Sequence, residues 1–389
     1  MIALGLLAAP LLAQHAVPFE IRDNRPMLRA RVEGSDPKGI VLDTGAASAL
    51  VLERELALDL GLEILDEQER HVGAGEGVRS RMGRAGGVRI DLGGLPISFP
   101  RIATLGFSNL NHYNETPIEG LLGHGFLAKR VVEIDYIERT VRIQEPGTFE
   151  ISPRGRELPL EFEGHLPIVT ATLALPGGRK LSARLAVDTG TRLALLLLAP
   201  FVDEHDLLEI PGGTAPTVVG CGAGGESRGA LRRIDGMRLG PFRVDRPVVA
   251  LSRDRAGVFV SRSFDGILGG AILKRCRVVF DYAGRRMVLE PGPFPPAPYV
   301  ADMSGLFMAL DPVQAGRFEV RAVVPGSPAH EAGIRVGDFI RTIDGRPAHE
   351  FELGALRELL IGEGRRVGLG IERGSEEAFL ATLVLRPLV

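Results

Sequence analysis

The sequence predicts a mainly β protein made of a duplicated lobe followed by a smaller α+β domain. Glycine (50) and proline (27) make up about a fifth of the 389 residues, whereas aromatic residues make up 5%. This composition suits many short strands and turns. The first 290 residues contain the same landmarks twice, which predicts two lobes of one fold. A proline-rich segment, 291–298, separates these lobes from about ninety further residues, enough for an independent domain.

The composition also limits the classes of function. Hydrophobic content of 45% and charged content of 24% are ordinary for a globular chain with a core. The net charge of −3 offers no bulk attraction to phosphate, so no nucleic acid partner is expected. Two cysteines exclude a disulfide scaffold and a four-thiolate metal site, and His-Glu-x-x-His is absent. We expect no metal and no other cofactor.

The two cysteines leave one alternative open. Cys276 lies in an apolar strand and fits a core position, whereas export would allow a Cys221–Cys276 disulfide. Residues Met1–Ala13 are apolar but too short to span a bilayer. They indicate a signal peptide over 1–16, with its basic start missing, and hence a periplasmic or secreted protein without an integral membrane span. The alternative is a buried first strand.

Three pairs of landmarks recur in the same order. Asp43-Thr44-Gly45 and Asp188-Thr189-Gly190 are 145 positions apart, and two further pairs follow at a spacing of 146. The further pairs are Gly120–Gly123 with Gly266–Gly269, and Val131–Tyr136 with Arg277–Tyr282. Landmarks that recur at one offset indicate a duplication. We therefore expect a first lobe over 17–150, a second over 151–290, a linker over 291–300 and a last domain over 301–389.

Each copy has the patterns of a β lobe. Met27–Val32 and Ile168–Leu173 alternate between apolar and polar residues, and an apolar run precedes each Asp-Thr-Gly. A short helix is predicted over Leu52–Leu60, ending at Gly61. A glycine-rich hairpin follows in each copy, with Gly73 and Gly75 in the first and Gly222 and Gly224 in the second. The second hairpin lacks the helix and the acidic residue of a nucleotide-binding loop.

The repeated tripeptide has a definite chemistry. An aspartate at the end of a buried strand sits on a tight turn, where Gly45 or Gly190 lets the next backbone N–H reach the carboxylate. Thr44 and Thr189 can bond inward through their hydroxyl groups. A pseudo-twofold axis would bring Asp43 and Asp188 face to face, and carboxylates about 3 Å apart share one proton. The ionised one can deprotonate a water while the protonated one polarises a carbonyl, which is amide hydrolysis without a covalent intermediate.

These residues resemble the aspartic peptidases, in the bacterial retropepsin-like branch that often carries a C-terminal PDZ domain. The resemblance covers about 17–290 and rests on the two Asp-Thr-Gly turns with their downstream segments, Leu121-Leu122-Gly123 and Ile267-Leu268-Gly269. In that family the apolar-Gly segment passes behind the catalytic loop. The resemblance implies two aspartic-protease-like lobes, Asp43 and Asp188 as the catalytic pair, and the four hairpin glycines as flaps.

Three features depart from pepsin. Ala46 replaces the hydroxyl residue that usually follows the first Asp-Thr-Gly, so one acidifying hydrogen bond is lost and we expect a less acidic pH optimum. Neither hairpin has a tyrosine, so the flaps would close with backbone and small side chains, as in viral enzymes. Arg192 has two alternatives. Pointing into the cleft, it would hold both carboxylates ionised and weaken the acid; otherwise it faces solvent.

Residues 301–389 resemble a PDZ domain. The resemblance rests on Gly326-Ser327-Pro328, Gly337-Asp338 and Asp344-Gly345, in that order. PDZ domains add an extended peptide to a sheet edge beside a helix, and that helix would span about Leu353–Leu360. The segment that matches the carboxylate-binding loop is Gly305, Leu306, Phe307 and Met308, with Phe307 where a glycine is usual.

Together these features predict an aspartic endopeptidase acting on a protein or peptide substrate. Its PDZ domain would bind a peptide ligand, either to deliver substrates or to regulate the cleft. One alternative is a catalytically inactive protein that binds peptides in the cleft and the PDZ groove. Another is pairing of lobes between chains, against which the repeat argues, because one chain carries both halves.

Overall fold

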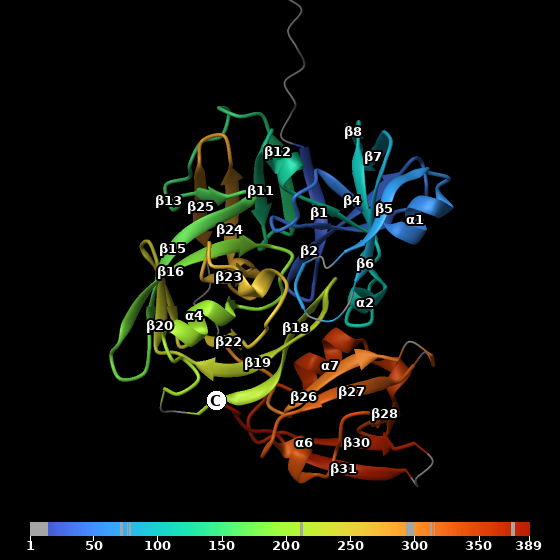
Figure 1. The fold of residues 1–389 in the computed structure, drawn as a ribbon, viewed down its shortest axis with the longest axis vertical. Helices are drawn as coiled ribbons and strands as arrows, with labels where there is room; N and C mark the ends of the chain where they lie inside the picture. Colours follow the sequence, from blue (N-terminus) through green and yellow to red (C-terminus); the bar gives the residue numbers. More distant parts are fainter. Residues whose placement is uncertain are drawn as a thin grey trace, which may run out of the picture.

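The computed structural model describes residues 15–70, 73–75, 77, 79–210, 213–292, 299–311, 313–314, 316–374 and 378–389. Two β lobes lie side by side, with the C-terminal α+β domain against one end of both (Figure 1). The predicted mainly β architecture is confirmed. Residues 1–14 of the predicted signal peptide and 293–298 of the predicted linker lie outside the described residues. Within these ranges, no helix is both long and apolar enough to cross a membrane.

Lobe 1 begins with a strand that the signal-peptide prediction partly overlaps, because His15 and Ala16 pair with Ile143 and Arg142. The elements of this lobe, with its share of the central sheet, are β1 (His15–Arg22), β2 (Arg25–Val32), β3 (Lys38–Leu42), β4 (Leu50–Glu53), α1 (Arg54–Asp59), β5 (Ile64–Arg70), β6 (Ser80–Ala85), β7 (Val88–Leu92), β8 (Leu95–Phe99), β9 (Ile102–Leu105), α2 (Ser108–Asn111), β10 (Gly120–Leu122), α3 (His124–Leu127), β11 (Val131–Asp135) and β12 (Thr140–Gln144).

Lobe 2 repeats this arrangement. Its elements are β14 (Glu161–Glu163), β15 (Leu166–Ala174), β16 (Lys180–Asp188), β17 (Leu195–Leu197), α4 (Ala199–Glu204), β18 (Ala215–Gly222), β19 (Gly225–Arg233), β20 (Gly236–Leu239), β21 (Phe242–Asp245), β22 (Val248–Ser252), the 3-10 helix η1 (Val258–Val260), β23 (Gly266–Gly269) and α5 (Gly270–Leu273). Strands β2, β3, β10, β4, β9 and β6 of lobe 1 neighbour one another in the same order as β15, β16, β23, β17, β22 and β19.

The predicted helix over Leu52–Leu60 is present but shorter. Leu52 and Glu53 belong to β4, where they pair with Gly120 and with β9. Helix α1 therefore starts at Arg54, with the Glu53 carboxylate accepting the Leu56 N–H as its cap. Beyond its end, Gly61 has φ of 72°, a conformation that favours glycine after a helix.

The lobes are joined by their own repeated segments. Strand β11 pairs antiparallel with β24 (Cys276–Asp281), so that Val131 faces Asp281 and Asp135 faces Arg277. The third pair of sequence landmarks therefore meets across the pseudo-twofold axis. Strands β12, β25 (Arg286–Pro291) and β13 (Arg156–Pro159) extend this central sheet, and one continuous hydrophobic core runs through both lobes.

The C-terminal domain has a separate core, which runs from Met303 to Leu385. Its elements are β26 (Leu306–Leu310), β27 (Phe318–Val323), α6 (Pro328–Glu331), β28 (Phe339–Ile343), β29 (Arg346–Pro347), the 3-10 helix η2 (Ala348–Glu350), α7 (Leu353–Leu359), β30 (Arg366–Glu372) and β31 (Phe379–Val384). Helix α7 occupies the position predicted for the groove helix. Strand β26 is an edge strand of this sheet.

This edge of the C-terminal domain packs against the lobes. The Leu310 N–H of β26 donates to the His112 carbonyl at 2.7 Å. The Arg321 guanidinium of β27 contacts the Glu226 carboxylate of β19 at 2.8 Å. Helix α7 and the loop next to β26 lie against the ends of both lobes (Figure 1). The C-terminal domain therefore contacts both halves of the duplicated body.

Candidate active site

Each Asp-Thr-Gly turn is held from behind by its downstream segment. Strand β3 pairs in parallel with β10, and the Asp43 N–H donates to the Leu122 carbonyl at 2.8 Å. Strand β16 pairs in parallel with β23 in the equivalent register, with Asp188 opposite Gly269. The two aspartates therefore stand at the ends of buried central strands, a rigid place for polar side chains.

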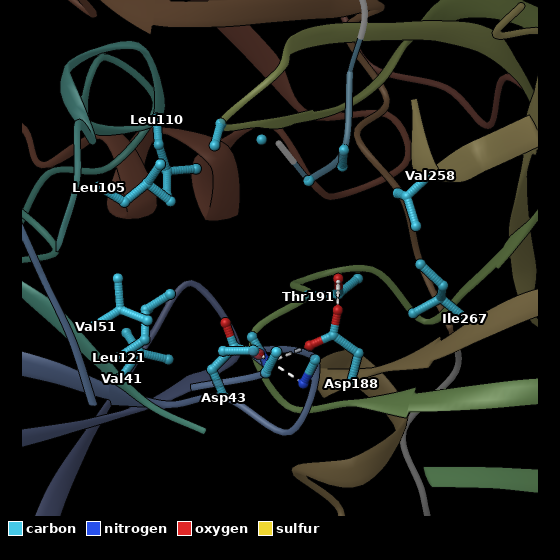
Figure 2. Close-up of a pocket in the computed structure, with 18 of the residues that line it drawn as sticks. Val41, Asp43, Val51, Leu105, Leu110, Leu121, Asp188, Thr191, Val258 and Ile267 are labelled. Atoms are coloured by element: carbon cyan, nitrogen blue, oxygen red, sulfur yellow. Dashed lines mark hydrogen bonds between the residues drawn. The ribbon is translucent and has the colours of Figure 1, made fainter. Parts of the chain in front are cut away.

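The two turns meet at the pseudo-twofold axis (Figure 2). A Cβ atom on Gly45 would lie 2.9 Å from Cγ of Asp188, and one on Gly190 would lie 2.5 Å from Cγ of Asp43. Only hydrogen at these two positions lets each carboxyl group approach the backbone of the opposite turn. The glycines predicted to admit their own N–H groups thus also admit the partner aspartate.

The two threonines bind the turns together across the axis. The Thr44 hydroxyl donates to the Val187 carbonyl at 2.6 Å and accepts the Thr189 N–H at 3.0 Å. The Thr189 hydroxyl donates to the Leu42 carbonyl at 2.6 Å and accepts the Thr44 N–H at 3.1 Å. Both side chains are fully buried. Four hydrogen bonds between lobes therefore fix the separation of the two aspartates.

Replacing Thr189 by valine is expected to lower the free energy of unfolding by about 2–6 kcal/mol. The substitution keeps the shape but leaves a buried N–H of Thr44 and a buried carbonyl of Leu42 without this partner, at about 1–3 kcal/mol each. Unfolding in guanidinium chloride measures the change. Thr172→Val on the exposed face of β15 is the control, and equal stability of the two variants would contradict the role of this contact.

The two carboxyl groups have different partners. Asp188 accepts the Gly190 N–H at 2.7 Å and the Thr191 hydroxyl at 2.7 Å. Asp43 accepts the Gly45 N–H at 2.8 Å, and Ala46 has no hydroxyl to offer. Burial and the nearby Asp188 charge raise the pKa of Asp43 to about 8, against the lowering effect of the Gly45 N–H. The shared proton of the pair therefore belongs on Asp43 at neutral pH.

Arg192 is among the residues that line the cavity of the two aspartates, but its guanidinium contacts other groups. Its guanidinium lies 3.8 Å from the Asp23 carboxylate and 5.6 Å from the centre of the Phe307 ring. Its side chain is 22% exposed, in the contact between lobe 2 and the C-terminal domain. The positive charge of Arg192 is thus paired with Asp23.

Two residues beside the pair were missed by the sequence reasoning. The Arg25 Nε donates to the Gly190 carbonyl at 2.7 Å, and His165 Nε2 donates to the Gly45 carbonyl at 3.0 Å. Arg25 is the first residue of β2, which pairs with the strand that leads to Asp43, and His165 lies in the turn before β15, which pairs with the strand that carries Asp188. The only signal in the sequence is the pair of turns, Asp23-Asn24 and Gly164-His165, just before β2 and β15.

The predicted flap glycines meet above the pair. The Gly224 N–H donates to the Ala74 carbonyl at 2.9 Å, and a Cβ on Gly222 would lie 2.6 Å from the same oxygen. Gly73 and Gly75 flank Ala74, and Gly75 contacts Gly225 so closely that it has no room for a side chain. One hairpin from each lobe therefore covers the site with backbone and small residues.

Beneath these hairpins lies a cavity of about 410 Å³ that both aspartates line. Figure 2 shows Asp43 and Asp188 facing each other at its floor, with apolar side chains on both sides. The labelled apolar residues are Val41, Val51, Leu105, Leu110 and Leu121 from lobe 1 and Val258 and Ile267 from lobe 2. A chain bound here would lie between two apolar walls.

The alternative of a Cys221–Cys276 disulfide is wrong. Both thiols are free, one at the end of the lobe 2 hairpin and the other in β24. Burial raises the pKa of Cys221 to about 12 and that of Cys276 to about 11, so neither is a thiolate at neutral pH. Among the described residues, no three His, Cys, Asp or Glu side chains are grouped to hold a metal.

The residues that match a carboxylate-binding loop face the lobes. The Phe307 ring lies 5.6 Å from the Tyr113 ring of lobe 1, and Gly305, Leu306 and Met308 line a cavity between the domains together with it. Phe307 and Leu306 are buried. A peptide carboxylate bound by this loop would therefore lie in the cavity between the C-terminal domain and the lobes.

A family model of the PDZ domain matches residues 319–373. The C-terminal domain is a PDZ domain. The magnetosome formation protease MamE of Magnetospirillum gryphiswaldense is 40% identical over 57 residues, which are 15% of this chain and 7% of that protein. Among solved structures, an aspartic proteinase from Irpex lacteus matches 74% of this chain and 100% of its own, with 13% identity and a TM-score of 0.48. This chain spans less than a tenth of the length of the curated relative.

Proposed function

We propose that the protein is an aspartic endopeptidase that hydrolyses peptide bonds with a water molecule held between Asp43 and Asp188. The observation that carries the proposal is the pairing of the two carboxyl groups on rigid, cross-bonded turns at the floor of a covered apolar cavity. Paired carboxyl groups whose surroundings differ supply an acid and a base at the same pH.

The two aspartates have separate roles in the proposed reaction. Asp188, with two donors to its carboxylate, is the base that takes a proton from the water. The water oxygen adds to the peptide carbonyl carbon while Asp43 donates its proton to the carbonyl oxygen. A proton then passes from the pair to the amide nitrogen, the C–N bond breaks, and the carboxylic acid and amine leave.

The walls of the cavity favour apolar substrate residues on both sides of the cleaved bond. The lobe 1 wall contains Val51, Leu105 and Leu121, and the lobe 2 wall contains Val258 and Ile267. Burial of such side chains contributes about 1.5–3 kcal/mol each. The glycines of the two hairpins would lie above the substrate backbone, where a backbone can approach closely.

We further propose that the PDZ domain regulates the cleft. Glu226, on the second strand of the lobe 2 hairpin, accepts the Tyr113 hydroxyl at 2.6 Å and the Arg321 Nε at 2.8 Å. One carboxylate thus links the flap hairpin to lobe 1 and to the PDZ domain. A peptide that moved β26 and β27 would act on this hairpin directly.

Cleavage of a complex peptide library from pH 3 to pH 9 tests the proposal. We expect the wild type to cut beside apolar residues and the Asp43→Asn/Asp188→Asn double variant to cut nothing. The rate should fall as the pH rises through about 8, because Asp43 then loses the proton it must donate. It should also fall at low pH, where the pair as a whole binds a second proton. Equal absence of cleavage by both folded proteins would favour the peptide-binding alternative.

A further inference from the structure

The turn between β1 and β2 reaches from lobe 1 onto the loop that follows Asp188. Its residues Asp23 and Asn24 have φ of 49° and 66°, which closes the hairpin tightly. The Asn24 amide donates to the Arg192 carbonyl at 2.6 Å, and Arg25 Nε donates to the Gly190 carbonyl at 2.7 Å. Lobe 1 therefore fixes two carbonyl groups of the loop that carries Asp188.

Arg25 is a buried cation that donates one hydrogen bond to a residue of each lobe. The residue is 8% exposed, and its Nη1 donates to the Asn114 side-chain oxygen at 2.5 Å. Asn114 is itself buried and donates to the Leu110 carbonyl at 2.8 Å. A buried guanidinium destabilises the fold unless negative charge lies nearby. Arg25 lines the cavity that contains the Asp43–Asp188 pair.

Two sources of negative charge lie near Arg25, which are Asp23 and the pair of aspartates. The ionisable groups that face it are Asp23, Asp43, Asp188, Arg192, Arg357 and Cys221. The Asp23 carboxylate also contacts the Arg357 guanidinium at 2.9 Å and the Arg192 guanidinium at 3.8 Å. The Cys221 thiol is neutral, since its pKa is about 12. Asp23 therefore attracts Arg25 most strongly, and the negative charge of the Asp43–Asp188 pair adds to this attraction.

The two lobes differ at this position. Lobe 1 places a permanent cation on the Gly190 carbonyl, whereas lobe 2 places His165 on the Gly45 carbonyl at 3.0 Å. Asp188 also receives two hydrogen bonds from its own loop. Asp188 therefore has two hydrogen-bond donors where Asp43 has the Gly45 N–H.

We propose that Arg25 is a positioning residue, which fixes the Asp188 loop through the Gly190 carbonyl and stabilises the negative charge of the Asp43–Asp188 pair. The consequence for the rate rests on the proposed peptidase function, but the effect on the ionisation of the pair does not. The two effects can be separated, because a side chain can keep the charge of Arg25 or its hydrogen bond without keeping both.

Arg25→Gln and Arg25→Lys separate the two effects. Glutamine can still donate to Gly190 but is neutral, so kcat should fall about 10- to 100-fold and both limbs of the pH profile should move to higher pH by about one unit. Lysine keeps the positive charge but loses one of the two hydrogen bonds of the guanidinium. The value of kcat should therefore fall, while both limbs of the pH profile stay within about a few tenths of a pH unit of the wild type. KM should change less than about threefold in both. Arg29→Gln, on the exposed side of the same strand, is the matched control and should change none of these values.

A titration of the aspartate carboxyl carbons by NMR decides the proposal without any activity. In the wild type, the step assigned to Asp43 should occur near pH 8, and Arg25→Gln should move it upward by about one unit. If the wild type cleaves nothing yet this step moves, the peptidase function fails and the role of Arg25 stands. If the step and kcat are both unchanged, the proposal is overturned. Should Arg25→Gln not fold, an unchanged kcat in Arg25→Lys would overturn it as well.

Discussion

Replacing Asp43 by asparagine should abolish peptide cleavage and at the same time make the protein more stable at pH 8. Loss of the general acid should lower kcat at least about 10²- to 10⁴-fold. The gain in stability has a separate cause. Burial and the Asp188 charge raise the pKa of Asp43 to about 8, whereas an aspartate in an unfolded chain ionises near 3.9.

The sign of the pH effect follows from proton binding. Between about pH 4 and pH 8 the unfolded chain has released this proton and the folded protein still holds it. The unfolded state then binds fewer protons, so the free energy of unfolding falls as the pH rises through this window. Asparagine cannot ionise, so the variant should lose less stability over the same range.

Thermal unfolding at pH 4, 6 and 8 measures this difference, beside a cleavage assay on the same samples. Asp36→Asn is the control, because its side chain is 98% exposed in the same lobe. It should cleave like the wild type and follow the wild-type dependence on pH. A variant Asp43→Asn that lost stability with pH as steeply as the wild type would contradict the buried, proton-holding Asp43.

The duplicated fold could be predicted because its signals are local in the sequence. Each Asp-Thr-Gly follows an apolar run, and each downstream apolar-Gly segment stands at a matched distance. Parallel pairing of β3 with β10 and of β16 with β23 is what those distances require. The roles of the two threonines also follow from residue type, since a buried hydroxyl needs partners.

Arg25 could not be identified in the same way. In the sequence it is one arginine among many, at the start of a strand with ordinary alternation. Its importance comes from the β1–β2 turn, which carries it into the other lobe, and no periodicity within one lobe encodes that contact. The contacts of Arg192 and Phe307 could not be predicted for a related reason. Both depend on how the PDZ domain packs against the lobes, which shape and charge decide rather than a motif.

Gly190→Ala should inactivate the protein although every polar group of the site remains. The added Cβ would lie 2.5 Å from Cγ of Asp43 and 2.6 Å from its Oδ1, closer than any real contact. Gly190 is not among the glycines with positive φ, so the backbone itself accepts alanine. The Asp43 carboxyl group, or the turn that carries it, must therefore move.

We expect at least a 100-fold loss of kcat, on the order of the loss that a displacement of about 1 Å causes at a catalytic group. Such overpacking should cost about 1–3 kcal/mol of stability. Gly86→Ala is the matched control, because its Cβ would meet nothing within 4 Å. If Gly190→Ala kept wild-type activity, the close approach of the two turns would not be a requirement of the reaction. If it failed while still folded, the separation of the two carboxyl groups would matter as well as their presence, and the four hydrogen bonds of Thr44 and Thr189 would be what maintains it.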